Sequence, residues 1–284
     1  MGKLDGKVAF ITGAARGQGR SHALRLATEG ADIIAVDICE QIDSVPYPLG
    51  TPEDLAQTVK EVEGTGRRIV AVKGDVRERS QLRAALDQGL ERFGRLDIVV
   101  ANAGICPWED STLCSGFVDG TDVDLIGVLN TVAVSLPHLK AGASIIVTGS
   151  TAGMMKGTTE AIGNTGGVGY SWAKQTIARY TETLALQLAE HSVRLNAIHP
   201  TNVNTNLLHN ASIYKAFRPD LDNPTREEAE PALATLQPMP TPYIEPEDVS
   251  NLVAFLASDE SKWITGQNIR VDAGSMLKGE RAAF

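Results

Sequence analysis

Residues 7–19 read KVAFITGAARGQG, and this stretch decides the fold. Lys7 to Thr12 is an apolar run without alternation, as expected of a strand buried on both faces of a parallel sheet. The run enters a turn and then a helix that ends near Gly30. The turn consists of Gly13, Ala14, Ala15, Arg16, Gly17, Gln18 and Gly19.

This glycine turn predicts a dinucleotide-binding unit. Glycine lets the backbone approach a pyrophosphate closely, and the N-terminus of the following helix offers N–H groups to it. The spacing is G-x-x-x-G-x-G rather than G-x-G-x-x-G, so a glycine-rich turn without a ligand remains an alternative.

The second strand, Ala31 to Val36, ends at Asp37, which lies 18 residues after Gly19. An acid in this place would accept hydrogen bonds from the adenosine ribose diol and would repel a 2′-phosphate. Asp37 therefore predicts NAD rather than NADP. Arg16 is the residue that argues for NADP, and we give Asp37 more weight.

The rest of the chain alternates between apolar runs and helical stretches. We expect further strands at 68–73, 96–101, 144–148, 193–198 and 268–271, with helices at about 53–63, 80–93 and 119–140. This alternation predicts an α/β fold, a doubly wound parallel sheet of about seven strands with helices on both faces. Without an internal repeat or linker, residues 1–284 are expected to form one domain.

Composition excludes several classes of protein. A net charge of −9 argues against nucleic acid or an anionic membrane as the main partner. No apolar run approaches the roughly 18 residues of a membrane span, and the first residues lack the apolar core of a secretion signal. Cys39, Cys106 and Cys114 have no metal-type spacing, so we expect reduced thiols and a cytoplasmic protein.

The connection from Ile38 to Gly66 is long for a crossover. It contains Pro46, Pro48 and Pro52 and then a helix. Long ordered loops in compact domains are often functional, so we interpret this insertion as a cover over the adenosine end of the cofactor. A tolerated surface insertion is an equally good interpretation.

Tyr170 and Lys174 lie one helical turn apart in the stretch YSWAK. A lysine ammonium on the same helix face would lower the tyrosine pKa from about 10. Bringing that pKa near 7 would need about 4 kcal/mol, and the phenol would then serve as a general acid/base. Alone, the pattern also fits an ordinary helix face.

Several motifs occur in order along the chain. They are TGAARGQG at 12–19, Asp37, Asp75-Val76, NAG at 102–104, Ser150, YSWAK at 170–174 and RLNAIHPTNVNT at 194–205. Together they resemble the short-chain dehydrogenase/reductase family over essentially the whole chain. The stretches 37–56, 199–210 and 217–232 are similar to the carveol dehydrogenase-like, mycofactocin-associated subgroup, whose members depend on NAD.

The resemblance implies an oxidoreductase that interconverts an apolar secondary alcohol, a terpenoid among the candidates, and its ketone. Tyr170 would exchange the hydroxyl proton during hydride transfer, and Lys174 would also hold the nicotinamide ribose. Ser150 would hydrogen-bond the substrate oxygen, although a turn or helix-cap serine is the alternative. Cofactor contacts are implied for the glycine turn and for Asp37, Asp75, Val76, Asn102, Ala103, Gly104, Tyr170, Lys174, Pro200, Val203 and Thr205.

One position departs from the family pattern. Asp124 stands where the family usually has an asparagine that holds a water for proton relay. Its carboxylate can accept from a water, but it could also pair with Lys174 and weaken the hold of that ammonium on Tyr170. We retain Asp124 as a relay residue.

Apolar residues suggest a substrate pocket beyond the catalytic set. Residues 205–240 are expected to form a lid with a short helix, or alternatively a subunit contact, and glycines at 163–169 suggest a flexible wall. Met154 and Met155 would adapt to an apolar ligand or fill the core. The predicted substrate residues are Trp108, Met154, Leu207, Leu208 and Tyr214, with Phe217 also on the lid.

The subgroup resemblance further implies tightly held NAD that is recycled in place by a redox partner (mycofactocin), and a homotetramer. A cofactor sensor or scaffold without turnover is a second hypothesis, which Asp124 keeps open. A methyltransferase is a third, and it would leave Tyr170 and Lys174 without a role. The five histidines have no metal-ligand spacing, so no metal is expected.

Overall fold

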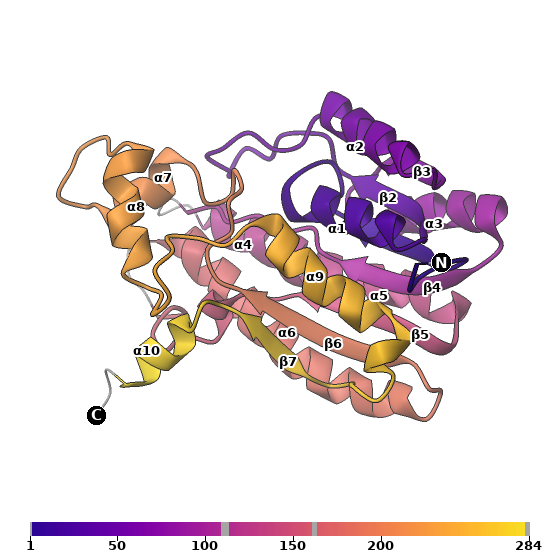
Figure 1. Cartoon of the computed structure of the whole chain (residues 1–284). Helices are drawn as coiled ribbons and strands as arrows, with labels where there is room; N and C mark the ends of the chain where they lie inside the picture. The colour runs from indigo at the N-terminus through magenta and orange to yellow at the C-terminus, as the bar shows by residue number, and fades with distance from the viewer. Residues whose placement is uncertain (1, 109–113, 161–163, 282–284) are drawn as a thin grey trace.

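The computed structural model describes residues 2–108, 114–160 and 164–281. Within these residues, seven parallel strands form one sheet in the order β3-β2-β1-β4-β5-β6-β7 (Figure 1). The strands are β1 (Val8–Thr12), β2 (Asp32–Asp37), β3 (Ile69–Lys73), β4 (Leu96–Ala101), β5 (Leu139–Thr148), β6 (Arg194–Pro200) and β7 (Asn268–Val271). The predicted doubly wound α/β fold is confirmed.

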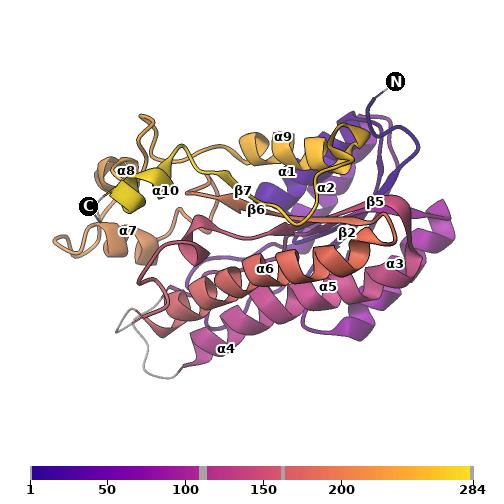
Figure 2. The same ribbon diagram turned by 90° about the horizontal axis from the view of Figure 1, so that it is seen from below.

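Helices cover both faces of the sheet, as Figure 2 shows. One face carries α1 (Gly17–Thr28), α2 (Pro52–Gly64) and α9 (Pro246–Ala257). The other face carries α3 (Arg79–Phe93), α4 (Ser115–Thr121), η1 (Asp122–Ile126), α5 (Gly127–Ser135) and α6 (Thr165–Ala189). The short helices α7 (Ala211–Phe217), α8 (Arg226–Ala234) and α10 (Ser275–Arg281) lie together beyond one end of the sheet. Single 3-10 turns complete the set at η2 (Leu136–His138), η3 (Thr151–Gly153) and η4 (Asp259–Ser261).

Alternate residues of a strand pack into separate cores on the two faces. In β1, Phe10 belongs to the core shared with α3, α5 and α6, whereas Ile11 belongs to the core shared with α1 and α9. Both side chains are fully buried. This two-sided burial explains why the strands read as continuous apolar runs.

The predicted boundaries hold best where a local signal marks them. Gly94, with φ of 78°, ends α3 in the left-handed conformation, and Thr51 with Asp54 forms a capping box at the start of α2. The helix expected over 119–140 is instead divided into α4, a π-helical turn and α5, and β5 begins five residues earlier than expected, at Leu139. The sequence did not predict α8 or α10.

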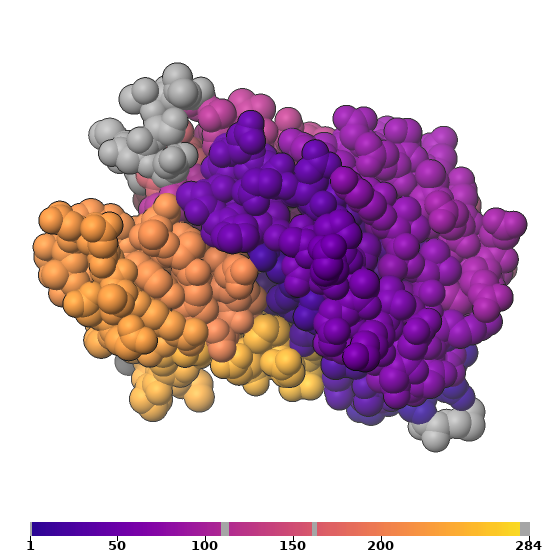
Figure 3. Space-filling model, turned by 90° about the horizontal axis from the view of Figure 1, so that it is seen from above, coloured from indigo at the N-terminus to yellow at the C-terminus, as the bar shows by residue number. Residues whose placement is uncertain are grey.

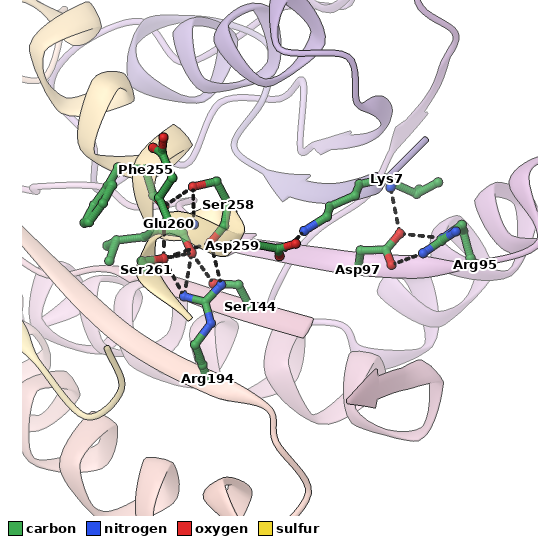
Figure 4. Close-up of polar contacts among 12 residues, drawn as sticks. Lys7, Arg95, Asp97, Ser144, Arg194, Phe255, Ser258, Asp259, Glu260 and Ser261 are labelled. Carbon is green, nitrogen blue, oxygen red and sulfur yellow. Dashed lines mark hydrogen bonds and ion pairs between the residues drawn. The ribbon is translucent and has the colours of Figure 1, made fainter. Parts of the chain in front are cut away.

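A buried arginine ties the sheet to α9 at the end away from the carboxyl ends of the strands (Figure 4). Arg194, at the start of β6, donates to the Leu256 carbonyl at 2.8 Å and to the Ser258 carbonyl at 3.1 Å. It also donates to the Ser261 hydroxyl at 2.7 Å. The guanidinium therefore satisfies carbonyls at the end of α9 that the helix itself leaves unpaired. Among the described residues, no helix is both long and apolar enough to traverse a bilayer.

Candidate active site

A cavity of about 520 Å³ lies at the carboxyl ends of the strands. Residues near 38–50 and the segment 205–240 border it from two sides, and Figure 3 shows the purple and orange surfaces of these parts next to each other. The predicted site residues that line it are Gly13, Arg16, Gly17, Gln18, Gly19, Asp37, Asp75, Val76, Asn102, Ala103, Gly104, Trp108, Asp124, Ser150, Tyr170, Lys174, Pro200, Val203, Thr205, Leu207 and Leu208.

Two glycines of the turn, Gly13 and Gly19, have no room for side chains. A Cβ on Gly19 would lie 1.9 Å from the Gly13 carbonyl oxygen, and one on Gly13 would lie 2.8 Å from Ala103 Cα. Gly13 also has φ of 68°, a conformation that disfavours other residues. The turn after β1 is therefore packed directly against the turn after β4, and it exposes backbone to the cavity.

The N-terminus of α1 faces this turn with its donors available. No described side chain caps α1, and its first turn contains no acid, in contrast to the capping box of α2. The Gln18 side-chain oxygen is buried without a hydrogen-bond partner among the described residues. Uncapped N–H groups at a positive helix end suit a pyrophosphate, so the residues present fit a dinucleotide.

Asp37 is fixed in place at the end of β2. Its carboxylate accepts from the backbone N–H of Ala15 at 2.9 Å and from that of Cys39 at 3.0 Å. The Arg16 guanidinium donates to the Pro48 carbonyl, and burial lowers the pKa of this arginine. The residue that would favour a 2′-phosphate thus has a protein partner, while the acid that would hold a ribose diol lines the cavity.

The loop from Ile38 to Thr51 reaches from the cofactor end to the catalytic half. Tyr47 is 4% exposed, and its hydroxyl accepts from the Cys106 N–H at 2.9 Å. Ser44 donates to the Asp119 carboxylate on α4 at 2.6 Å. The loop thereby forms a wall of the cavity, to which Ile38, Ile42, Tyr47, Leu49 and Gly50 contribute.

Ser150 follows β5 and uses its side chain in two ways. Its hydroxyl oxygen accepts from the Ala152 N–H at 3.1 Å, which caps the short turn η3. The same side chain hydrogen-bonds to Tyr170, which acts to lower the tyrosine pKa. The helix-cap interpretation and the catalytic interpretation of Ser150 are therefore compatible with one another.

Lys174 lies between the backbone of β5 and a carboxylate. Its ammonium donates to the Thr148 carbonyl at 2.9 Å and lies 2.9 Å from Asp124 Oδ1. Lys174 and Asp124 are 2% and 0% exposed. The ammonium is 5.5 Å from the centroid of the Tyr170 ring. The ion pair that the sequence suggested is present, and the lysine faces both the acid and the phenol.

The pKa of Tyr170 differs from the expectation. Burial raises it above its ordinary value, and the nearby Cys106 and Asp124 raise it further, while the Ser150 hydrogen bond opposes them. The predicted lowering of the Tyr170 pKa is wrong for this structure, because burial has the largest influence and Asp124, which pairs with Lys174, acts in the same direction as burial. Burial likewise raises the pKa of Asp124, against the lowering effect of Lys174.

A π-helical turn places Asp124 in the site. Residues Asp122–Ile126 form this turn between α4 and α5, and such turns are frequent at functional sites. The Ile105 N–H donates to Asp124 Oδ2 at 3.2 Å. A Cβ on Gly104 would lie 2.6 Å from Asp124 Oδ1, so the ion pair with Lys174 requires glycine at position 104.

The far end of the cavity is apolar. Leu208, Ile213 and Leu233 form a small buried cluster, against which Trp108, Phe217 and Tyr243 pack. Among the described residues, Met154 and Tyr214 do not line the cavity, whereas Met155, Ile213 and Phe217 do. The Tyr214 hydroxyl instead lies 2.9 Å from Nδ1 of His209. Leu207 and Leu208 precede α7 rather than lying on it.

Sequence reasoning missed several residues of the cavity wall, among them Tyr47, Cys106 and Ile213. Tyr47 was the one detectable in advance, as the only aromatic residue in the 38–51 loop. Gly163, part of the expected flexible wall, lies outside the described residues. No cluster of metal-ligating side chains occurs in the part of the chain that the structure describes.

The chain is similar to known proteins over nearly its whole length. A family model described as enoyl-(acyl carrier protein) reductase matches residues 13–276. A (−)-trans-carveol dehydrogenase of Rhodococcus erythropolis is 46% identical over 286 residues, which covers 98% of this chain and 100% of that protein.

Solved structures are similar over the same extent. A carveol dehydrogenase from Mycobacterium avium in complex with NAD has a TM-score of 0.90 and 44% identity, covering 98% of this chain and 100% of that one. A short chain dehydrogenase from Mycobacterium paratuberculosis bound to NAD has a TM-score of 0.85 and 39% identity, covering 97% and 100%. As its motifs predicted, the chain belongs to the short-chain dehydrogenase/reductase family.

Proposed function

We propose that this protein is an NAD-dependent short-chain alcohol dehydrogenase that interconverts an apolar secondary alcohol and its ketone. The observation that carries the proposal is one cavity with Asp37 and the glycine turn at one end and Ser150, Tyr170 and Lys174 at the other. The predictions of an oxidoreductase and of NAD are confirmed at this level by NAD-bound relatives. A terpenoid alcohol of the carveol type is the proposed substrate class.

Tyr170 acts as the acid/base of the reaction. When bound, NAD would supply the hydride acceptor for the carbinol carbon, and its positive charge would favour the phenolate form of Tyr170. The Ser150 hydroxyl holds the substrate oxygen next to the phenol, and Tyr170 takes the hydroxyl proton. In this proposal, the Lys174 ammonium holds the nicotinamide ribose from its buried position beside Tyr170.

Asp124 passes the proton onward. Its carboxylate contacts Lys174, and burial raises its pKa, so it can accept a proton more readily than an exposed aspartate. We expect Asp124→Asn to change the pH profile of turnover. Turnover and a pH profile identical to those of the wild type would remove Asp124 from the relay.

The substrate side of the cavity supports an apolar ligand. Trp108, Met155, Leu208, Ile213 and Phe217 line it, and the segment 205–240 supplies most of them. These side chains offer contact area without charge, as expected for a hydrocarbon-rich alcohol. In this proposal, residues 205–240 are the substrate lid of a single catalytic domain that spans residues 1–284.

The 38–66 insertion holds NAD so firmly that it is recycled in place by a redox partner, mycofactocin being the proposed one. The Tyr47–Cys106 and Ser44–Asp119 hydrogen bonds support this role, because they connect the loop to the opposite side of the cavity. Mass spectrometry of the denatured protein should find NAD. Absence of the cofactor, with fast exchange in solution, would remove the idea.

The proposed assembly is a cytoplasmic homotetramer. Apolar side chains on one outer layer support a subunit contact: Val118 on α4, Ile126 on η1, and Trp172 and Leu186 on α6 are 54%, 39%, 42% and 78% exposed. Cys39 and Cys106 are buried without disulfides, which fits a reducing compartment. Light scattering of the purified protein tests the tetramer, and a monomeric mass would contradict it.

A cofactor sensor without turnover is the second candidate. The Lys174–Asp124 ion pair and the raised pKa of Tyr170 favour it. The two candidates differ in a screen of secondary alcohols, trans-carveol first, with an artificial electron acceptor and separately with added NAD. An enzyme gives turnover that Tyr170→Phe abolishes, whereas a sensor gives none in either case.

A further inference from the structure

The hydrogen bonds between β5 and β6 end just before Ser150. Paired residues run from Ser144 with Arg194 to Thr148 with Ile198, and the Gly149 N–H then donates to the Ile198 carbonyl at 2.8 Å. Pro200 has no N–H with which to extend this pairing. The next backbone N–H, that of Ser150, is paired with a side chain instead of a carbonyl. It lies 3.2 Å from Nδ1 of His199.

The opposite ring nitrogen identifies the tautomer of His199. Nε2 lies 2.9 Å from the side-chain oxygen of Asn268. That amide is oriented by its nitrogen, which donates to the Ala178 carbonyl at 3.3 Å and to the Glu182 carboxylate at 3.0 Å. Nε2 therefore carries the proton of the neutral ring. Nδ1 lies 3.2 Å from both the N–H and the carbonyl oxygen of Ser150. In the neutral ring it accepts from the N–H, and only the imidazolium would donate to the carbonyl.

His199 is kept neutral and immobile. It is 0% exposed, and its pKa is lowered first by burial. The facing charges of Lys174 and Arg270 lower this pKa further, while the hydrogen bond to Asn268 and the contact of Nδ1 with the Ser150 carbonyl oppose them. A Cβ on Gly149 would lie 2.4 Å from the imidazole, so the ring fits closely against the backbone beside Ser150.

We propose that His199 is a positioning residue for catalysis, because its imidazole orients the Ser150 peptide and so directs the Ser150 hydroxyl toward Tyr170 and the substrate oxygen. This inference rests on the proposed alcohol dehydrogenase function. His199 does not touch the substrate in this account; it acts through Ser150.

The first test compares three substitutions of His199, of which Asn and Gln have similar polarity. The Asn side chain can place an acceptor near the position of Nδ1, whereas Gln places its polar group near that of Nε2. With trans-carveol and NAD, we expect His199→Gln and His199→Ala to lower kcat by about ten- to a hundredfold. His199→Asn should recover a substantial part of the loss, while the KM for NAD stays unchanged in all three.

The second test changes the protonation of His199 without altering its ring. Asn268→Asp places a carboxylate opposite Nε2, which raises the pKa of His199 and favours the imidazolium. An imidazolium cannot accept from the Ser150 N–H, so kcat should gain a new fall toward low pH. Glu182→Gln is the matched control, because it leaves the Asn268 oxygen in place and should add no such limb.

These outcomes separate the inference from the proposed function. Full loss of activity in Tyr170→Phe, together with wild-type kcat in His199→Gln, would overturn only the role of His199. Equal losses in His199→Asn and His199→Gln would also overturn it, as would an unchanged pH profile in folded Asn268→Asp. Wild-type activity in Tyr170→Phe would overturn the proposed function itself.

Discussion

Two segments enclose the same cavity, and they are held in different ways. The 38–51 loop is attached by hydrogen bonds to distant parts of the chain, from Tyr47 to Cys106 and from Ser44 to Asp119. The 205–240 segment packs mainly through a small apolar cluster of its own, built on Leu208, Ile213 and Leu233. The first cover is hydrogen-bonded to the catalytic half, and the second is packed around an apolar cluster of its own.

This difference matches the two ligands. Release of NAD from under the 38–51 loop requires directional bonds to break together, some of them buried. Movement of the 205–240 segment requires a small apolar unit to separate from the cavity, and few directional bonds hold it, among them the Gln237–Thr201 hydrogen bond. We therefore propose that the 38–51 loop retains the cofactor and that the 205–240 segment controls exchange of the substrate.

Tyr47→Ala should have the largest effect on this comparison. It leaves the buried Cys106 N–H without its acceptor and removes a buried ring, at a cost of about 3–5 kcal/mol for truncation of a large core side chain. We expect NAD to dissociate about a hundredfold faster, measured by fluorescence after dilution. Tyr47→Phe, which removes only the hydroxyl, should give a smaller increase. Equal release from all three proteins would refute the role of the loop.

Leu233→Ala should weaken the other cover. Leu233 is fully buried in the lid cluster, and truncation of a buried leucine costs about 2–5 kcal/mol. Because this cost is local to the lid, we expect the KM for trans-carveol to rise about tenfold, with the bound NAD content unchanged. Loss of NAD together with the rise in KM would mean that the two covers are not independent.

Ser44→Ala tests one anchor of the loop. The lost bond joins a hydroxyl to the Asp119 carboxylate, and hydrogen bonds to charged groups contribute about 1.5–3 kcal/mol. Partial exposure reduces this contribution, so NAD should dissociate about fivefold faster. Stopped-flow exchange against a fluorescent NAD analogue measures the rate. If NAD dissociates from Ser44→Ala at the wild-type rate, the Ser44–Asp119 hydrogen bond does not contribute to retention of NAD.

The smallest expected effect concerns pH. His209, in the lid, has its pKa lowered from 6.5 first by burial and then by Arg226. In an opened lid, His209 would bind a proton more readily than in the closed lid. The closed form therefore loses stability relative to the open form as pH falls below 6.5. The KM for the alcohol should rise severalfold toward pH 5, whereas NAD release should not change. In His209→Gln the KM should be independent of pH over this range.

The fold and the cofactor end were predictable because their signals are local. A buried apolar run, a glycine turn and Asp37 lie within one short stretch, and together they favour a dinucleotide-binding unit. Tyr170 and Lys174 were found for the same reason, since i and i+4 share a helix face.

The rest depends on contacts between residues far apart in the chain. Tyr47 meets Cys106 across 59 residues, and no local pattern indicates this pairing. The raised pKa of Tyr170 depends on burial and on Asp124, which only the fold brings together. The π-helical turn at Asp122–Ile126 has no sequence signal. Which side of α7 faces the cavity depends on the conformation of the turn that precedes this helix.

The central claim is that alcohol oxidation occurs on NAD held beside Tyr170. The most direct measurement adds trans-carveol to the purified protein without added NAD and follows the nicotinamide absorbance. The account predicts stoichiometric NADH that remains with the protein through gel filtration and that does not form in Tyr170→Phe. No reduction of bound NAD by any secondary alcohol tested, or equal reduction in Tyr170→Phe, would contradict it.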